Sequence, residues 1–131
     1  MSAYKKLNCC FGDLTNLTQS LKNLGFKPVI NKKKQKLVGY QGDVRNEEAD
    51  IIIPKNQISQ VSNDLGFIYD EKLKEYTMIC SDYDLHKGLG DKVIQAYALE
   101  AIKSALRKNK FNMGAEKRKN KKITLKVSKI I

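Results

Sequence analysis

The first quarter of the chain alternates apolar and polar residues and then changes to a helical repeat. Residues 7–11 alternate with a period of two, which predicts a strand. Leucines at 14, 17, 21 and 24 follow at spacings of three or four, the stripe of an amphipathic helix. Asp13 stands where an N-cap belongs, and Gly25 follows as a left-handed C′ residue. We therefore expect a strand followed directly by a capped helix.

Three further segments predict a series of short strands. Residues 27–30 are expected to form a short edge strand, and the lysine-rich residues 31–35 a polar turn. Residues 37–40 have strand character and are followed by glycine, which indicates a tight turn. Residues 49–53 combine β-branched side chains in an apolar run, and Pro54 ends that strand.

The second half predicts two hairpins on either side of a long helix. Residues 65–69 and 76–80 alternate with a period of two and are expected to pair with each other. A polar connection is expected over 81–90, a helix over 91–108, and a last hairpin over 111–127. The helix is expected to bury Ile94, Ala98, Ala101 and Ala105, widened by Val93, Tyr97 and Ile102, and to expose Lys92, Gln95, Glu100, Lys103, Ser104 and Arg107.

The order of these elements predicts an α+β fold. Runs of strands with few helices favour a mostly antiparallel sheet with two helices packed on one face. The 131 residues suit a single domain, 1–131, whose last part, 103–131, is a basic C-terminal hairpin. No segment has the length of apolar sequence that a membrane span needs, and the N-terminus does not resemble a secretory signal.

Positive charge is concentrated near the C-terminus. The chain has 25 basic and 14 acidic residues, a net charge of +11. Residues 103–131 contain 11 basic residues and one acidic residue, so this segment alone carries +10. Such a field attracts polyanions. Arginine, the better bidentate partner of phosphate, occurs only three times, so the composition alone favours lysines that serve solubility over a surface for polyanions.

The densest cationic cluster is the candidate binding site. On a hairpin loop and the preceding helix end, its side chains would contact a phosphate backbone without reading sequence, because no aromatic residues are interleaved for base stacking. The proposed polyanion-binding residues are Arg107, Lys108, Lys110, Lys117, Arg118, Lys119, Lys121 and Lys122.

Other candidate chemistry is weak. His86 is the only histidine and has no nearby ligands in the sequence, so neither a metal site nor a cofactor is expected. Gly88 and Gly90 precede a helix but match neither phosphate-binding fingerprint, and Asp82 and Asp84 are expected to be solvated acids at a helix entry. The number and spacing of the three cysteines favour buried free thiols over a disulfide bond from Cys80 to Cys9 or Cys10. Free thiols in turn favour a reducing compartment.

Several segments together resemble a family of small cyanobacterial and plastid proteins, the hypothetical chloroplast open reading frame thirty-five family. The similarity covers nearly the whole chain and consists of Leu14 to Phe26, Val38 to Gly42, Ala49 to Ile53, Gly66, Phe67, Tyr76, Asp82, Val93, Gln95, Tyr97, Ala98 and Phe111. The chain differs from the family pattern in having no tryptophan and in having Leu99 where histidine is common. The resemblance implies a small soluble domain of plastid, cyanobacterial or viral origin and assigns no catalytic residue.

These observations lead to three hypotheses. The first is a non-enzymatic binding or accessory protein that contacts nucleic acid or another polyanion through its C-terminal half. It would work in the plastid stroma or the cytoplasm, or in a virion. The second is a protein–protein adaptor or structural subunit in which the lysines serve solubility only. It would bind through an apolar sheet face or an exposed edge strand, with Val29–Ile30 and Ile130–Ile131 as apolar contacts. The third, an enzyme, predicts a deep pocket near 81–92.

Overall fold

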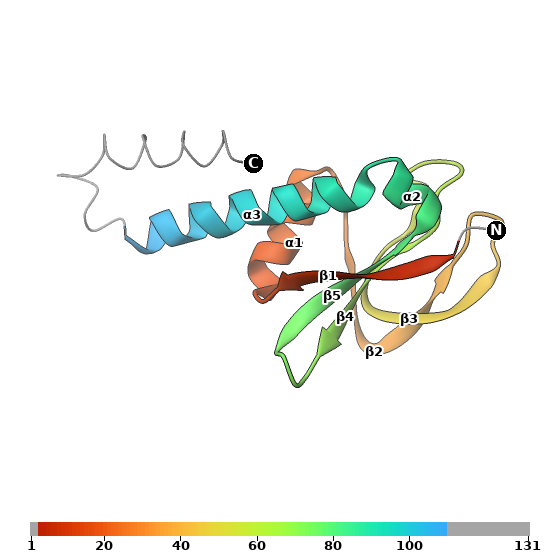
Figure 1. The fold of residues 1–131 in the computed structure, drawn as a ribbon, viewed down its shortest axis with the longest axis horizontal. Helices are drawn as coiled ribbons and strands as arrows, with labels where there is room; N and C mark the ends of the chain where they lie inside the picture. The colour runs from red at the N-terminus through yellow and green to blue at the C-terminus, as the bar shows by residue number, and fades with distance from the viewer. Residues whose placement is uncertain (1–2, 110–131) are drawn as a thin grey trace.

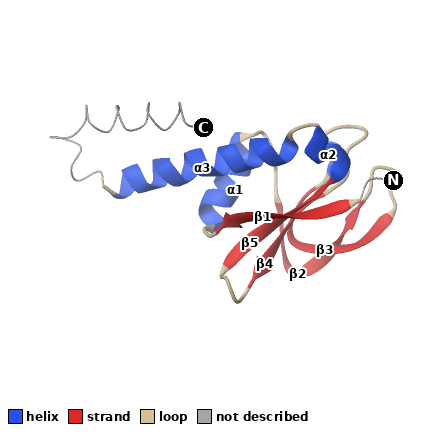
Figure 2. Cartoon of the chain, in the orientation of Figure 1, coloured by secondary structure: helices blue, strands red, loops and turns tan. Residues whose placement is uncertain are grey.

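The computed structural model describes residues 3–109 and shows a five-stranded sheet with its helices on one side (Figures 1 and 2). The strands lie in the order β1-β5-β4-β3-β2, and every neighbouring pair is antiparallel. The predicted α+β class is therefore confirmed. In chain order the elements are β1 Tyr4–Phe11, α1 Leu14–Asn23, β2 Val29–Val38, β3 Val44–Ile53, the 3₁₀ turn η1 Lys55–Gln57, β4 Leu65–Asp70, β5 Glu75–Ser81, α2 Asp82–His86 and α3 Leu89–Lys108.

The main core lies between the sheet and the two long helices. Leu17 and Leu21 from α1 and Val93 from α3 are fully buried in one cluster with Phe67 and other inward side chains of the sheet. The ring of Phe11 meets the Phe67 ring edge-on, with centroids 5.7 Å apart. The prediction of two helices on one face of the sheet is confirmed.

A second core lies on the opposite face, under a hairpin that curls. Leu37 and Ala49, from β2 and β3, are buried together with Ile52 and Ile79. Arg45 on β3 reaches the ring of Tyr4 on β1, with 5.0 Å between the guanidinium carbon and the ring centroid. Since β5 and β4 separate β1 from β3 in the sheet, this contact requires the β2–β3 hairpin to bend across the open face.

The ends of α1 form as the sequence predicts. The Asp13 carboxylate accepts a hydrogen bond from the Asn16 backbone N–H at 2.9 Å, as an N-cap does. Gly25 follows the helix with φ of 91°, a left-handed conformation that other residues rarely adopt. Both signals are local, so the helix bounds follow from the sequence.

The expected turn over 31–35 is wrong. These residues belong to β2, which runs without interruption from Val29 to Val38, and β3 begins at Val44 rather than at residue 49. The reason is the position of β2 at the sheet edge, where both faces of its lysine-rich section remain exposed. A strand with no buried face shows no apolar alternation, so pattern analysis assigns it to a loop.

The expected polar connection over 81–90 is also wrong. Ser81 caps the short helix α2, accepting a hydrogen bond from the Asp84 backbone N–H, and α3 already begins at Leu89. Gly88, with φ of 86°, separates the two helices. The short helix lacks the two or more turns that a periodic pattern needs to become visible.

The buried face of α3 includes Val93 and Tyr97, as predicted, but it is shifted away from the rest of the predicted stripe. Ile94 is 37% exposed, whereas Glu100, which was expected to face water, is only 5% exposed. The inward residues include Leu89 and Val93. The predicted alanine stripe lies beside this inward face, and its helical spacing matched a buried face equally well. Glu100 turns inward because Asn23 on α1 donates a hydrogen bond to its carboxylate.

We expect Gly66→Ala to lower the free energy of unfolding by about 1–3 kcal/mol, the usual cost of overpacking a core. A Cβ at Gly66 would lie 2.8 Å from the Ala49 Cβ and 3.0 Å from a Leu37 methyl group, between the sheet and the curled hairpin. Urea denaturation measures the change. Gly12→Ala is the matched control, because nothing lies within 4 Å of its added Cβ. Equal stability of the two variants would contradict the packing of the hairpin over Gly66.

Candidate functional site

Only two of the eight predicted polyanion-binding residues lie in the described part of the chain. Arg107 and Lys108 are both exposed at the end of α3, which projects beyond the sheet (Figure 1). The residues predicted at 110, 117–119, 121 and 122, the hairpin over 111–127 and the Ile130–Ile131 contact lie outside the described residues.

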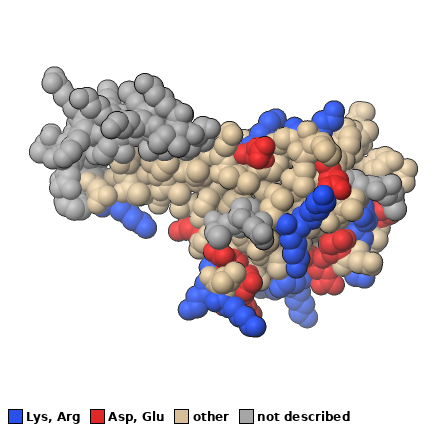
Figure 3. All heavy atoms as spheres, viewed as in Figure 1, with Lys and Arg blue, Asp and Glu red and all other residues tan. Residues whose placement is uncertain are grey.

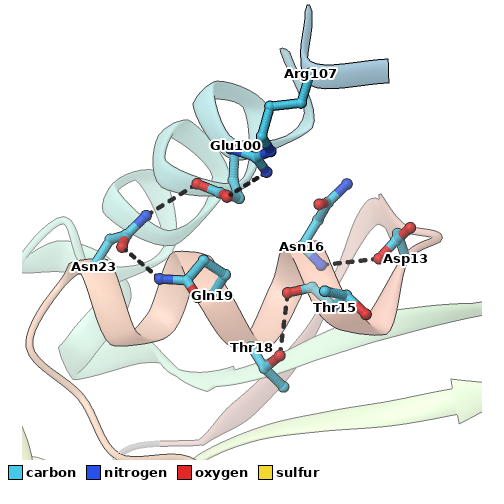
Figure 4. Close-up of polar contacts among 8 residues, drawn as sticks. All are labelled: Asp13, Thr15, Asn16, Thr18, Gln19, Asn23, Glu100 and Arg107. Atoms are coloured by element: carbon cyan, nitrogen blue, oxygen red, sulfur yellow. Dashed lines mark hydrogen bonds and ion pairs between the residues drawn. The ribbon is translucent and has the colours of Figure 1, made fainter. Parts of the chain in front are cut away.

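Arg107 belongs to a polar cluster between α1 and α3. Its Nη2 donates to Glu100 Oε1 at 3.2 Å, and Asn23 Nδ2 donates to Glu100 Oε2 at 3.1 Å (Figure 4). Gln19 Nε2 in turn donates to Asn23 Oδ1 at 2.9 Å. One N–H edge of the Arg107 guanidinium is therefore bound to the buried Glu100, while most of the Arg107 side chain remains accessible.

Charges of both signs are interspersed over the visible surface of the sheet (Figure 3). Several of them form ion pairs, such as Lys5 with Asp82 at 3.0 Å and Lys34 with Asp50 at 3.4 Å. Residues 3–109 contain 17 basic and 13 acidic residues, a net charge of +4. The face of the described domain seen in Figure 3 therefore carries both signs of charge.

A buried polar network joins the segment before β4 to the rest of the fold. The carboxylate of Asp64 accepts hydrogen bonds from the backbone N–H groups of Val38, at 2.9 Å, and Lys55, at 2.8 Å. The Tyr4 hydroxyl donates to the Asp64 carbonyl oxygen at 2.7 Å. Burial raises the pKa of Tyr4 above its ordinary value, and the nearby negative charge of Asp64 acts in the same direction. Asp64 thus links three strand ends.

The neighbouring Asn63 extends this network to α2. Its side-chain Oδ1 accepts from the Tyr40 backbone N–H at 3.0 Å, and its Nδ2 donates to Ser81 Oγ at 3.0 Å. Asp84 Oδ2 accepts from Ser81 Oγ at 2.8 Å and from the Asn63 backbone N–H at 3.1 Å. The expectation that Asp84 is a solvated acid is therefore wrong, because the fold buries its carboxylate among donors.

A hollow of about 350 Å³ opens beside this network, in the region where the enzyme hypothesis places a pocket. Ser59 and Ser62 line it from the loop before β4, with their hydroxyl oxygens 2.6 Å apart. Lys87 and Lys92 line it from the helical side, and the Lys87 ammonium lies 5.6 Å from the centre of the Tyr83 ring. The hollow can admit a small ligand, and the Asp84 carboxylate lines it together with the two lysines, so its walls carry both signs of charge.

The remaining candidate groups show no catalytic arrangement within residues 3–109. His86 is exposed at the end of α2, and this part of the chain has no cluster of His, Cys, Asp or Glu that could hold a metal ion. Cys80 is a buried free cysteine, as predicted. Burial raises the pKa of its thiol to about 12, helped by the charges of Asp84 and Asp82. Its thiol therefore stays protonated and is a poor nucleophile near neutral pH.

The fold and its surfaces define a small α+β domain with polar and cationic surface features. Residues 20–127 match the family described as Protein of unknown function (DUF1257), and the chain belongs to that family. No curated protein and no solved structure matches the chain. None of the helices formed by the described residues is long and apolar enough to cross a membrane.

Sequence analysis missed two groups of polar residues. The network of Asn63, Asp64 and Asp84 was not found, although Ser-Asn-Asp before an apolar strand was a visible signal that this polar loop is held by its own side chains. Lys32, Lys33 and Lys34 were assigned to a turn, and they instead lie on an edge strand. Their run of positive charge was the available signal.

Replacing Asp64 with alanine should lower the free energy of unfolding by about 2–4 kcal/mol, because two backbone N–H groups lose their acceptor. Chemical denaturation measures the loss, and faster hydrogen exchange of the Val38 and Lys55 amides locates it. Asp91→Ala, an exposed acid on α3, is the control and should change stability little. Unchanged exchange at both amides would show that the Asp64 carboxylate does not hold these strands.

Cys80 should resist alkylation in the folded protein at pH 8, since its raised pKa keeps the thiol neutral and the side chain is buried. Iodoacetamide treatment followed by peptide mass spectrometry should find Cys80 unmodified without urea and modified in 8 M urea. Rapid labelling of Cys80 without denaturant would contradict both its burial and its protonation state.

Proposed function

We propose that this protein is a non-enzymatic binding module that contacts nucleic acid or another polyanion through its C-terminal half, starting at the end of α3. The observation that carries the proposal is the concentration of a net charge of +10 in residues 103–131, against +1 in the preceding 102 residues. We also propose that the chain is a plastid or cyanobacterial protein of the hypothetical chloroplast open reading frame thirty-five family, as the sequence resemblance implies. It would work in the stroma, the cytoplasm or a virion.

The position of α3 supports this assignment. The helix carries its C-terminal end away from the sheet, where most of the described acids lie (Figures 1 and 3). Lys103 and Lys108 are exposed there, and Arg107 keeps most of its side chain accessible beside Glu100. A polyanion approaching this end meets cations with few competing carboxylates, which favours electrostatic binding.

Binding to a 20-base-pair DNA duplex should weaken steeply with salt. If about five phosphates are neutralised, log affinity falls with log salt concentration at a slope of about −4 to −5. Fluorescence anisotropy between 50 and 200 mM NaCl measures the slope. Changing Lys117, Arg118, Lys119, Lys121 and Lys122 together to glutamine should flatten the slope. Changing Lys22, Lys72 and Lys74 to glutamine should leave most of the slope unchanged.

Two results would overturn the proposal. One is the absence of binding at 50 mM NaCl. The other is a slope that is the same in the five-residue variant and the three-residue control. A partner from native extract that stays bound at 0.5 M NaCl would instead favour the adaptor hypothesis, for which the exposed Val29 and Ile30 at the sheet edge are the supporting observation.

A further inference from the structure

The lysine-rich section of β2 forms a free edge of the sheet. Within residues 3–109, β2 stands last in the strand order and pairs only with β3, so one edge of its backbone faces no neighbouring strand. Such an edge presents N–H and C=O groups that can pair with an added strand. The register of β2 against β3 is irregular between Ile30 and Gln35, which changes the local direction of the edge.

Its charge distinguishes β2 from an ordinary edge strand. The ten residues of β2 include four lysines and no acid. Asp50 on β3 pairs with Lys34 at 3.4 Å, and Glu48 lies opposite Lys36 in the register. Lys32 and Lys33 are exposed and form no ion pair with any described residue. The edge therefore keeps uncompensated positive charge after its own neighbours are counted.

The N-terminal end of the same strand is apolar and exposed. Val29 is 45% exposed and Ile30 is 58% exposed. Lysines alone would be explained as protection of an edge against aggregation, a common device in natural sheets. That explanation does not cover Val29 and Ile30, since exposed β-branched residues at an edge promote the pairing that lysines discourage.

We propose that β2 is a docking edge for an extended acidic segment of a partner protein, which adds as a strand beside it. Backbone hydrogen bonds would supply affinity, and an apolar residue near one end would contact Val29 and Ile30. Because Lys32 and Lys33 point to opposite faces of the strand, carboxylates on either face of the segment would find a lysine partner. Opposite charges across a strand pair stabilise the pairing, which selects acidic segments over neutral ones. This inference does not rest on the C-terminal residues of the proposed function.

The test uses the full-length chain labelled with nitrogen-15 and two synthetic ten-residue peptides. One alternates glutamate with valine, and the other alternates glutamate with proline. The second peptide keeps the charge and remains extended, but proline removes backbone donors and cannot take part in a strand ladder. We expect the glutamate–valine peptide to shift the amide signals of β2 and to slow their hydrogen exchange, and the glutamate–proline peptide to do neither.

Two variants separate charge at this edge from charge in general. Changing Lys32, Lys33 and Lys36 to serine should weaken binding of the glutamate–valine peptide by about threefold, as expected for the loss of one or two exposed charge pairs on whichever face the glutamates occupy. Changing Lys22, Lys72 and Lys74 to serine removes the same charge from other exposed positions and should weaken it far less. The C-terminal glutamine variant should bind the peptide normally, so failure here and failure of polyanion binding are distinguishable.

Several outcomes would overturn the inference. Equal binding of both peptides would show attraction of charge without strand addition. Shifts confined to other elements would place the acidic ligand elsewhere. A single-stranded oligonucleotide that shifts the β2 amides more strongly than the peptide, without slowing their exchange, would assign the lysines to phosphate. Circular dichroism of the variants confirms that any loss of binding does not come from unfolding.

Discussion

The shape of this domain depends on how the carboxylate of Asp64 satisfies buried backbone donors. It accepts from Val38 at the end of β2 and from Lys55 just after β3, while Tyr4 of β1 donates to the carbonyl oxygen of the same residue. A buried polar group without a partner costs free energy, so these contacts fix three strand ends at one place. The curl of the β2–β3 hairpin over the open face is anchored at this point and completed by the packing of Leu37 and Ala49.

That curl determines which surfaces remain available. It covers much of the face opposite the helices and brings Arg45 over Tyr4, so this face is partly closed. It also leaves β2 at the sheet edge, with its lysine-rich section exposed on both faces. On the other side, α3 packs against α1 through Glu100 and Asn23 and continues beyond the sheet. Two groups of cations in the described chain thus lie on an edge strand and at a helix end.

This division has a functional consequence. A polyanion is recognised by accumulated charge and needs little shape, which suits the C-terminal residues. A protein segment is recognised through a backbone edge together with charged and apolar side chains, and β2 presents all three. The two proposals therefore use different chemistry on different parts of one small domain. A module with both surfaces can bring an acidic protein and a polyanion together, and its family membership alone assigns neither role.

Local signals in the sequence determined the capped helix α1, the hairpin of β4 and β5, the long helix α3 and the α+β class, because capping residues and apolar periods act over a few neighbouring residues. Tertiary structure alone decided that residues 31–35 form an edge strand, that Glu100 rather than Ile94 turns inward, and that Asp84 is buried. In each case a polar group gains its partner from a distant segment, β3, α1 or the loop before β4. Such partners are invisible to periodicity, since they depend on which segments the fold brings together.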